Sequence, residues 1–180
     1  AAMQRRFGAR VHKVALDAGL ACPHVERLGR GCTYCANESF NPGRRRPWRQ
    51  VSEQLREGIA FLKKRFGAER FIAYYQAGSN TNAPVERLDA LYREGTDHPD
   101  VVGLAVGTRP DCLSDEVLEL LAAYDRRLGA SLEIGLQSAN QATLDRVNRG
   151  HTVREFAEAV RRARARGLAI VAHVILGLPG

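Results

Sequence analysis

The segment "DVVGLAVGTRPDCLSDEVLELLAAYDRRLG", residues 100–129, decides the fold class of this chain. It opens with a nearly continuous apolar run over residues 100–108, which predicts a buried strand. A polar turn follows, and residues 113–129 then carry apolar side chains at helical spacing, with Ser114 as N-cap and acidic residues in the first turn. A buried strand that leads directly into a helix is the unit from which parallel sheets are built.

The same unit recurs on both sides of this segment. Ser52 is the expected N-cap of the first helix, and Gly67 and Gly167 are expected to end two of the helices. We therefore predict an α/β fold of parallel strands with covering helices, in a single domain over residues 1–180. Further strands are predicted at residues 10–16, 70–77, 131–138 and 169–180, and further helices at residues 52–67, 83–95, 140–150 and 152–167.

The last predicted strand runs to the end of the sequence, "LGLPG" at residues 176–180. A parallel sheet that stopped there would leave a long apolar edge without a partner. We therefore expect a fold that is truncated after its fifth strand, in a domain that is incomplete at its C-terminus.

The composition is that of a globular domain, with 44% hydrophobic and 26% charged residues in a chain of 180. No apolar run approaches the roughly 20 residues of a membrane span. The N-terminus lacks the apolar region of a secretory signal, and four cysteines in such a chain do not suggest a disulfide framework. We expect a cytoplasmic protein with no membrane partner.

The formal net charge of +7 leaves two interpretations open. Either arginines cover an ordinary surface, or the protein binds a polyanion such as RNA. The segment "GRRRPWR", residues 43–49, mixes cations with Trp48, a combination that suits phosphate binding and base stacking. Four other arginines crowd one predicted helix and are expected to be mostly solvated: Arg161, Arg162, Arg164 and Arg166.

Three of the four cysteines lie in "ACPHVERLGRGCTYCANESF", residues 21–40, just after the first predicted strand. Nine residues separate Cys22 from Cys32, and two separate Cys32 from Cys35. A structural zinc site needs four ligands, so it would have to recruit another, such as the nearby His24 or Cys112 far along the chain. A [4Fe–4S] cluster is normally held by four cysteines, and three would leave one iron open for a substrate or cofactor. The residues alone leave both alternatives open.

Polar or glycine-rich segments follow the other predicted strands as well. Because the chemistry of parallel α/β folds sits at the carboxyl ends of the strands, we expect one active site at this edge of the sheet. In the fourth strand, Glu133, Gly135 and Gln137 share one face by alternation, where two buried polar side chains would need partners. The segments are "QAGSN" at residues 76–80, "GTRPDC" at 107–112, "GLQS" at 135–138 and "ILGLPG" at 175–180.

The cysteine loop resembles the cluster loop of radical S-adenosylmethionine (SAM) enzymes. The long-spaced variant in the catalytic subunit of Elongator is similar in Cys22-Pro23-His24, in the nine-residue gap and in "CTYC". The segments "GTRPDCL", "LEIGLQSAN", "NRGHTV" and "VAHVILGLPG" resemble that subunit and, more closely, its YhcC-like relatives, so the resemblance covers residues 10–180.

This resemblance implies a partial (β/α) barrel of the radical SAM type. It also implies that Cys22, Cys32 and Cys35 hold a [4Fe–4S] cluster whose open iron binds SAM. In such enzymes one electron from the cluster cleaves SAM to methionine and a 5′-deoxyadenosyl radical, and the protein positions the reacting groups.

Contacts to SAM from the first two strand ends are implied too. Tyr34 would lie near the adenine, unless it is a loop aromatic packed on the sheet. Backbone around Gln76 and Ala77 would meet the SAM amino group, although this sequence departs there from the usual Gly-Gly-Glu.

Four side chains of the later segments are implied to face SAM. Glu133 and Gln137 would contact its ribose and methionyl parts, the alternative being a buried hydrogen-bond network. Arg149 would bind the carboxylate, because a guanidinium matches a carboxylate at two points. His173 would point at the cofactor rather than being a satisfied core histidine.

The third strand end carries residues with two interpretations each. Arg109 and Asp111 would either contact substrate or SAM, or form only an ion pair. Cys112 would be a buried structural thiol or a group that reacts with radicals.

The partners implied are a reductant such as flavodoxin or ferredoxin, and tRNA or another RNA as substrate. The rival function is a zinc-binding, nucleic-acid-binding module without catalysis, which predicts a fourth protein ligand at the metal.

Overall fold

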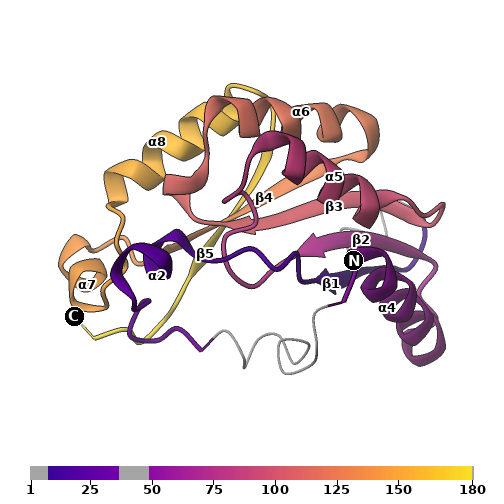
Figure 1. Ribbon diagram of the computed structural model, residues 1–180, viewed down its shortest axis with the longest axis horizontal. Coiled ribbons are helices and arrows are strands. Elements are labelled where there is room, and N and C mark those ends of the chain that lie inside the picture. Colours follow the sequence, from indigo (N-terminus) through magenta and orange to yellow (C-terminus); the bar gives the residue numbers. More distant parts are fainter. Residues whose placement is uncertain (1–7, 37–48, 180) are drawn as a thin grey trace.

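The computed structural model describes residues 8–36 and 49–179 of the chain (Figure 1). Within these residues, five strands form one sheet of parallel neighbours whose order in space follows their order in the sequence. This confirms the predicted α/β class. The arginine and tryptophan segment at residues 43–48 lies outside the described residues. The strands are β1 (Val11–Leu16), β2 (Arg70–Tyr75), β3 (Val101–Thr108), β4 (Ala130–Gln137) and β5 (Ala169–Val174).

Helices alternate with the strands along the chain, as the sequence predicts. In Figure 1, α5, α6 and α8 lie together on one side of the sheet. The longer helices are α4 (Val51–Phe66), α5 (Val85–Thr96), α6 (Asp115–Leu128) and α8 (Val153–Arg164). The shorter ones are α2 (Pro23–Leu28), the 3-10 turn η2 (Pro110–Cys112) and α7 (Gln141–Arg146).

One face of the sheet forms the hydrophobic core with these helices. Tyr75, Val106 and Leu132 are register partners on neighbouring strands, and all three are fully buried in this core. A Cβ on Gly58 of α4 would lie 2.4 Å from Val14 Cγ1 of β1. Glycine at this position therefore lets α4 approach β1 closely.

The other face of the sheet carries polar side chains and is concave. Lys13 of β1 donates a hydrogen bond to Glu133 of β4, although β2 and β3 lie between them. In a flat sheet these two strands would be about 14 Å apart, at about 4.8 Å per strand. The contact therefore requires the sheet to curve around this face, which agrees with the predicted partial barrel.

The helix ends agree with the sequence in part. Ser114 caps α6, since its side chain accepts a hydrogen bond from Val117 N at 3.2 Å, and Gly67 ends α4 with a φ of 60°. The expected cap at Ser52 is wrong, because Gln50 precedes the first turn and Ser52 N donates to Glu94 Oε1 of α5. Helix α8 ends at Arg164, so Gly167 lies in the following turn and not at the helix end.

Two of the four arginines expected on α8 are less solvated than predicted. Arg162 and Arg166 both form ion pairs with Asp115 at 2.9 Å, and Arg166 also pairs with Glu119 at 2.7 Å. Both acidic residues belong to α6. Arg162 of α8 and Arg166 of the turn after it therefore join this part of the chain to α6. Arg161 and Arg164 are exposed, as predicted.

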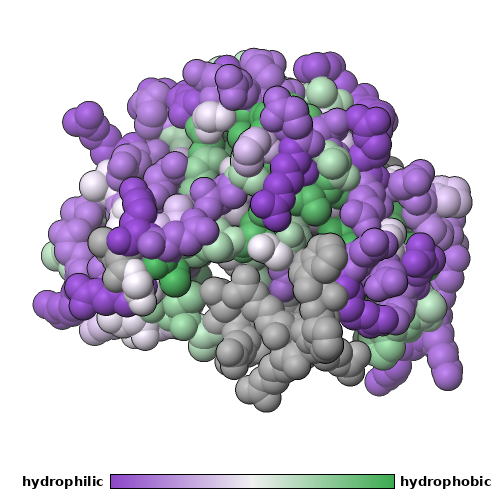
Figure 2. Space-filling view, viewed as in Figure 1, coloured by the Kyte–Doolittle hydropathy of each residue, from purple (hydrophilic) through white to green (hydrophobic). Residues whose placement is uncertain are grey.

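Most residues on the face shown in Figure 2 are hydrophilic, with apolar residues visible between them. Apolar side chains are more exposed along β5, at the edge of the described sheet, where Val174 is 58% exposed. No helix among the described residues is long and apolar enough to cross a membrane.

Candidate cofactor site at the carboxyl edge of the sheet

The three clustered cysteines lie in the loop that follows β1. Cys22 precedes the first turn of α2, and Cys35 N donates to Cys32 O at 2.9 Å in a tight turn. Cys22 and Cys32 are partly buried and Cys35 is exposed, and none of the chain's cysteines is in a disulfide. The loop therefore presents three thiols at the carboxyl edge, as predicted. The short helix α2 within it was not predicted, although Pro23 at its start and Gly29 at its end are favourable signals.

His24, the nearby candidate for a fourth zinc ligand, uses one ring nitrogen elsewhere. It is buried, and its Nε2 donates to Asn148 O at 2.8 Å. A Cβ on Gly150 would lie 2.3 Å from His24 Nδ1, so the ring packs directly against this glycine. Burial is the main reason that the pKa of His24 is lowered.

Gln137 and Arg149 meet above Gly135. A Cβ on Gly135 would lie 2.5 Å from Gln137 Nε2 and 2.7 Å from an Arg149 terminal nitrogen. A register irregularity follows Gly135, and Gln137 has a φ of 73°. The simple alternation predicted for β4 therefore holds up to Gly135 and is broken at Gln137. The two predicted SAM residues are nevertheless brought together by the fold.

Glu133 lies deeper in the concave face, four residues before Gln137. It is 4% exposed, and its two carboxylate oxygens accept hydrogen bonds from Lys13 and from His173 Nε2, the latter at 2.9 Å. Burial by itself would raise the pKa of Glu133, but hydrogen bonds from Lys13 and Tyr74 and the charges of Lys13 and His173 lower it below its ordinary value. The carboxylate is therefore held in its ionised form.

Lys13 and Tyr74 are the members of this cluster that the sequence reasoning missed. The Lys13 ammonium also lies 4.3 Å from the centre of the Tyr74 ring. The sequence did contain a signal for Lys13, because it is a charged residue within the β1 pattern "VHKVAL". It lies two positions after Val11 and two before Ala15, so it shares a face of the strand with them. That signal alone did not identify the partner, because the partner is on a strand 120 residues away in sequence.

The loop after β2 contains two consecutive left-handed residues. Ala77 has a φ of 70° and Gly78 a φ of 79°. A Cβ on Gly78 would lie 2.5 Å from Leu20 O, so this loop lies against the start of the cysteine loop. Asn80 Nδ2 donates to Gly107 O at 3.0 Å and joins the same loop to the end of β3. The Gln76 segment is thus at the carboxyl edge, where the resemblance requires it.

The residues after β3 form an ion pair. Arg109 donates to both carboxylate oxygens of Asp111, at 2.9 and 3.1 Å, and its third nitrogen donates to Arg149 O at 3.0 Å. Burial would raise the pKa of Asp111, but Arg109 lowers it below its ordinary value. Burial raises the pKa of Cys112 to about 11, so this thiol stays protonated at neutral pH. Arg109 therefore braces the turn that carries Arg149.

A sequence model of the Radical SAM superfamily matches residues 24–180. The chain belongs to the radical SAM superfamily.

Its relatives support the same assignment. The chain is 41% identical over 181 residues to Protein YhcC of Escherichia coli strain K12. This alignment covers 99% of this chain and 57% of that protein. It is 39% identical over 197 residues to Elongator complex protein 3 of Schizosaccharomyces pombe, covering 88% of this chain and 35% of that protein. The chain therefore spans only about half, or less, of the length of these relatives.

The fold is shared with a solved structure. The structure of archaeal Elp3 from Methanocaldococcus infernus, with an N-terminal deletion, superposes with a TM-score of 0.66 at 22% sequence identity. The match covers 96% of this chain and 39% of that one. At this identity the comparison supports the fold alone.

The donor set of this radical SAM chain, three cysteine thiols outside any disulfide, fits an iron–sulfur cluster. Among the described residues, no group of three His, Cys, Asp or Glu side chains lies close enough to share one metal ion. A [4Fe–4S] cluster binds each cysteine at a different iron, so its thiolates stand farther apart.

Two polar atoms near the thiols also fit a polar ligand. The Tyr34 hydroxyl and Arg149 Nε are buried without a hydrogen-bond partner among the described residues. Burial raises the pKa of Tyr34, so its hydroxyl is a neutral donor. Buried polar groups without a hydrogen-bond partner destabilise the fold unless a ligand or water supplies that partner. The roles of Tyr34, Gln76, Glu133, Gln137, Arg149 and His173 toward SAM remain predictions.

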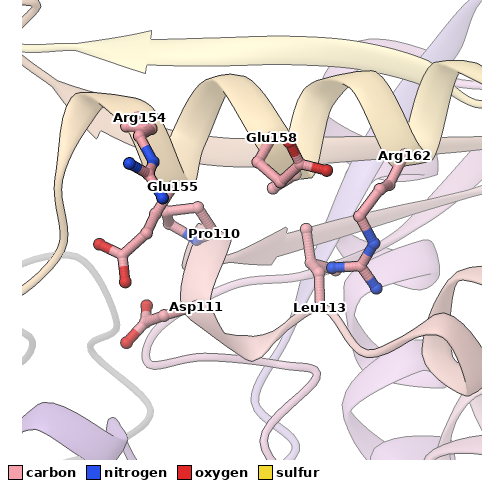
Figure 3. Close-up of a pocket in the computed structure, with 8 residues that line it drawn as sticks. Pro110, Asp111, Leu113, Arg154, Glu155, Glu158 and Arg162 are labelled. Carbon is pink, nitrogen blue, oxygen red and sulfur yellow. The ribbon is translucent and has the colours of Figure 1, made fainter.

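A surface pocket of about 380 Å³ lies apart from this site, between η2 and α8 (Figure 3). Asp111 and Glu155 approach it from these two elements, and Arg154 and Arg162 also line it. Its charges are of both signs, and of the residues considered for contact with SAM or substrate only Asp111, which is paired with Arg109, lines it. It therefore gives no reason to move the candidate site from the carboxyl edge.

Proposed function

We propose that this chain is the core of a radical SAM enzyme. Cys22, Cys32 and Cys35 hold a [4Fe–4S] cluster, and the site binds SAM beside it. When bound, the cluster supplies the electron that cleaves SAM to methionine and a 5′-deoxyadenosyl radical. The observation that carries the proposal is the loop of three cysteines outside any disulfide, held at the same edge as Gln137 and Arg149.

The chain's own residues would bind and orient the reactants. Gln137 and Tyr34 offer polar groups beside the cysteine loop, and Tyr34 is half-buried with an unsatisfied hydroxyl. Glu133 holds Lys13 and His173 in place on the concave face below them. Preorganised groups of this kind bind without paying for reorganisation during the reaction.

For the substrate we propose RNA, with tRNA as the first candidate. The formal charge of +7 and the 39% identity to Elongator complex protein 3 support this choice. A flavodoxin or ferredoxin would supply the electron, and we expect the reaction to take place in the cytoplasm, where thiols stay reduced.

The test is anaerobic reconstitution followed by iron and sulfide analysis and electron paramagnetic resonance of the reduced protein, with and without SAM. We expect a cluster signal that shifts when SAM is added. Cys22→Ala, Cys32→Ala and Cys35→Ala should each lose the cluster, whereas Cys112→Ala, the matched control, should keep it. Bound zinc, or a cluster signal that does not change when SAM is added, would count against the proposed function, and bound zinc would support the zinc-binding module instead.

A further inference from the structure

The turn between α7 and α8, residues 147–150, is bonded to the cysteine loop on both sides of Cys32. Thr33 N donates to Val147 O at 3.0 Å, and Asn148 Nδ2 donates to Gly31 O at 3.0 Å. We call these residues the 147–150 turn. Cys32 is thus flanked by two hydrogen bonds from a segment more than 110 residues away in sequence.

The same turn also holds the part of the loop next to Cys22. His24 is 2% exposed, and its Nε2 donates to Asn148 O at 2.8 Å. The His24 ring fills the space that a side chain at position 150 would need. Asn148 takes a left-handed conformation, with a φ of 53°, which lets its side chain and its carbonyl both face the cysteine loop.

Arg149 reaches a cysteine sulfur from this turn. One terminal nitrogen of its guanidinium lies 3.7 Å from Cys32 Sγ, and the other donates to Gly135 O at 2.7 Å. Arg149 is 7% exposed, and only its Nε lacks a partner among the described residues. The arginine is held in this place because Arg109 donates to its carbonyl at 3.0 Å.

This geometry gives Arg149 a contact beyond the role that the resemblance implies for it. A guanidinium carries five N–H donors, and each terminal nitrogen of Arg149 faces one partner here, a sulfur or a carbonyl. Its Nε has no partner among the described residues and is left for another acceptor. The nitrogen that faces Cys32 is a charge-assisted donor to that sulfur, separate from any contact with SAM.

We infer that Arg149 is a positioning residue for Cys32, and that the 147–150 turn holds the cysteine loop in the shape that the cluster needs. The inference rests on the proposed function, since it concerns the cluster that the three cysteines would hold. Hydrogen bonds to the sulfurs of an iron–sulfur cluster stabilise its reduced, more negative state and so raise its reduction potential.

The first test is a redox titration of the cluster-loaded chain, followed by electron paramagnetic resonance, in the absence of SAM. Arg149→Gln should shift the midpoint potential to a more negative value, and Arg149→Lys, which keeps the charge, should shift it less. Arg146→Gln is the matched control, because Arg146 is an exposed cation in the same segment. A residue that acts only on SAM would leave the SAM-free potential unchanged in Arg149→Gln, and that result would overturn the inference.

The second test uses a variant that preserves the backbone. Asn148→Gly keeps the left-handed conformation accessible and removes only the bond to Gly31. We expect it to lose its cluster to an iron chelator about 10-fold faster than the wild type, the size usual for loss of an outer-shell partner. Loss at the wild-type rate would contradict the supporting role of the turn.

The two proposals fail in different ways. If the wild type assembled no iron–sulfur cluster, the proposed function would fail and the inference with it, and no variant would give a signal. If the wild type gave a SAM-responsive cluster while Arg149→Gln kept the wild-type potential and Asn148→Gly the wild-type rate of loss, only the inference would fail.

Discussion

Three non-glycine residues with positive φ angles surround the candidate site. Ala77 follows β2, Gln137 ends β4, and Asn148 lies in the 147–150 turn, with φ angles of 70°, 73° and 53°. Among the described residues these are the only non-glycine positions of this kind. Such conformations cost free energy and persist where the surrounding structure imposes them, often at functional sites. Asparagine tolerates them well, and alanine does not.

Ala77→Gly should therefore stabilise the chain, by about 0.5 kcal/mol. Relief of the left-handed strain is worth about 1–2 kcal/mol, and the added freedom of glycine in the unfolded state removes about 0.4–1 kcal/mol of that gain. Ala90→Gly, on the exposed side of α5, is the matched control and should destabilise by about 1 kcal/mol. The measurement is denaturant unfolding, and equal losses in both variants would refute the strain at Ala77.

At the scale of the elements, one cluster of side chains joins four strands across the concave face. Lys13, Tyr74, Glu133 and His173 come from β1, β2, β4 and β5, and Glu133 accepts hydrogen bonds from the other three. This cluster connects strands that the backbone ladder does not pair directly. These contacts can form only because the sheet is curved, and they stabilise it in that shape.

Lys13→Met should destabilise the fold by about 2 kcal/mol, because it leaves a buried carboxylate without its main cationic partner. Lys63→Met is the control, since Lys63 pairs with Asp100 at 2.8 Å on the exposed surface and should cost at most about 1 kcal/mol. Denaturant unfolding at neutral pH measures both. A similar small loss in both variants would show that the Lys13 pair is no stronger than a surface ion pair.

The contribution of Glu133 should also depend on pH. Its folded-state pKa lies below the ordinary value of 4.5, so the stabilisation is fully present above that pH and is lost as the pH falls through the folded pKa. We expect Glu133→Gln to be less stable than the wild type at neutral pH, and the gap to close below pH 4.5. A difference in unfolding free energy that stayed constant or widened as the pH fell would contradict this pH dependence.

At the scale of the whole molecule, the proposed RNA substrate and the net charge of +7 together predict salt-dependent binding of tRNA. Affinity should fall steeply as salt rises, because the cations replace counterions on the phosphates. Arg30→Gln, at an exposed arginine beside the cysteine loop, should weaken binding and reduce the slope of log affinity against log salt by about 1. Arg162→Gln should leave the slope unchanged, since Arg162 pairs with Asp115 of α6. An affinity for tRNA that does not change with salt concentration would count against an RNA substrate.

The sequence by itself determined the alternation of strands and helices and the placement of three cysteines after the first strand. Both follow from local patterns, since apolar periodicity and cysteine spacing can be read along a short window. The parallel pairing then predicted that the polar strand ends, with Gln137 among them, would gather at one edge.

Only the tertiary structure decided which side chains satisfy one another. Lys13 meets Glu133, His24 meets Asn148, and Arg149 meets Cys32, each across more than 110 residues of sequence. The register irregularity after Gly135 and the positive φ of Gln137 also had no clear local signal. The physical reason is that a buried polar group takes its partner from whatever the fold brings within hydrogen-bond reach, and that choice depends on the curvature of the sheet and the path of distant loops.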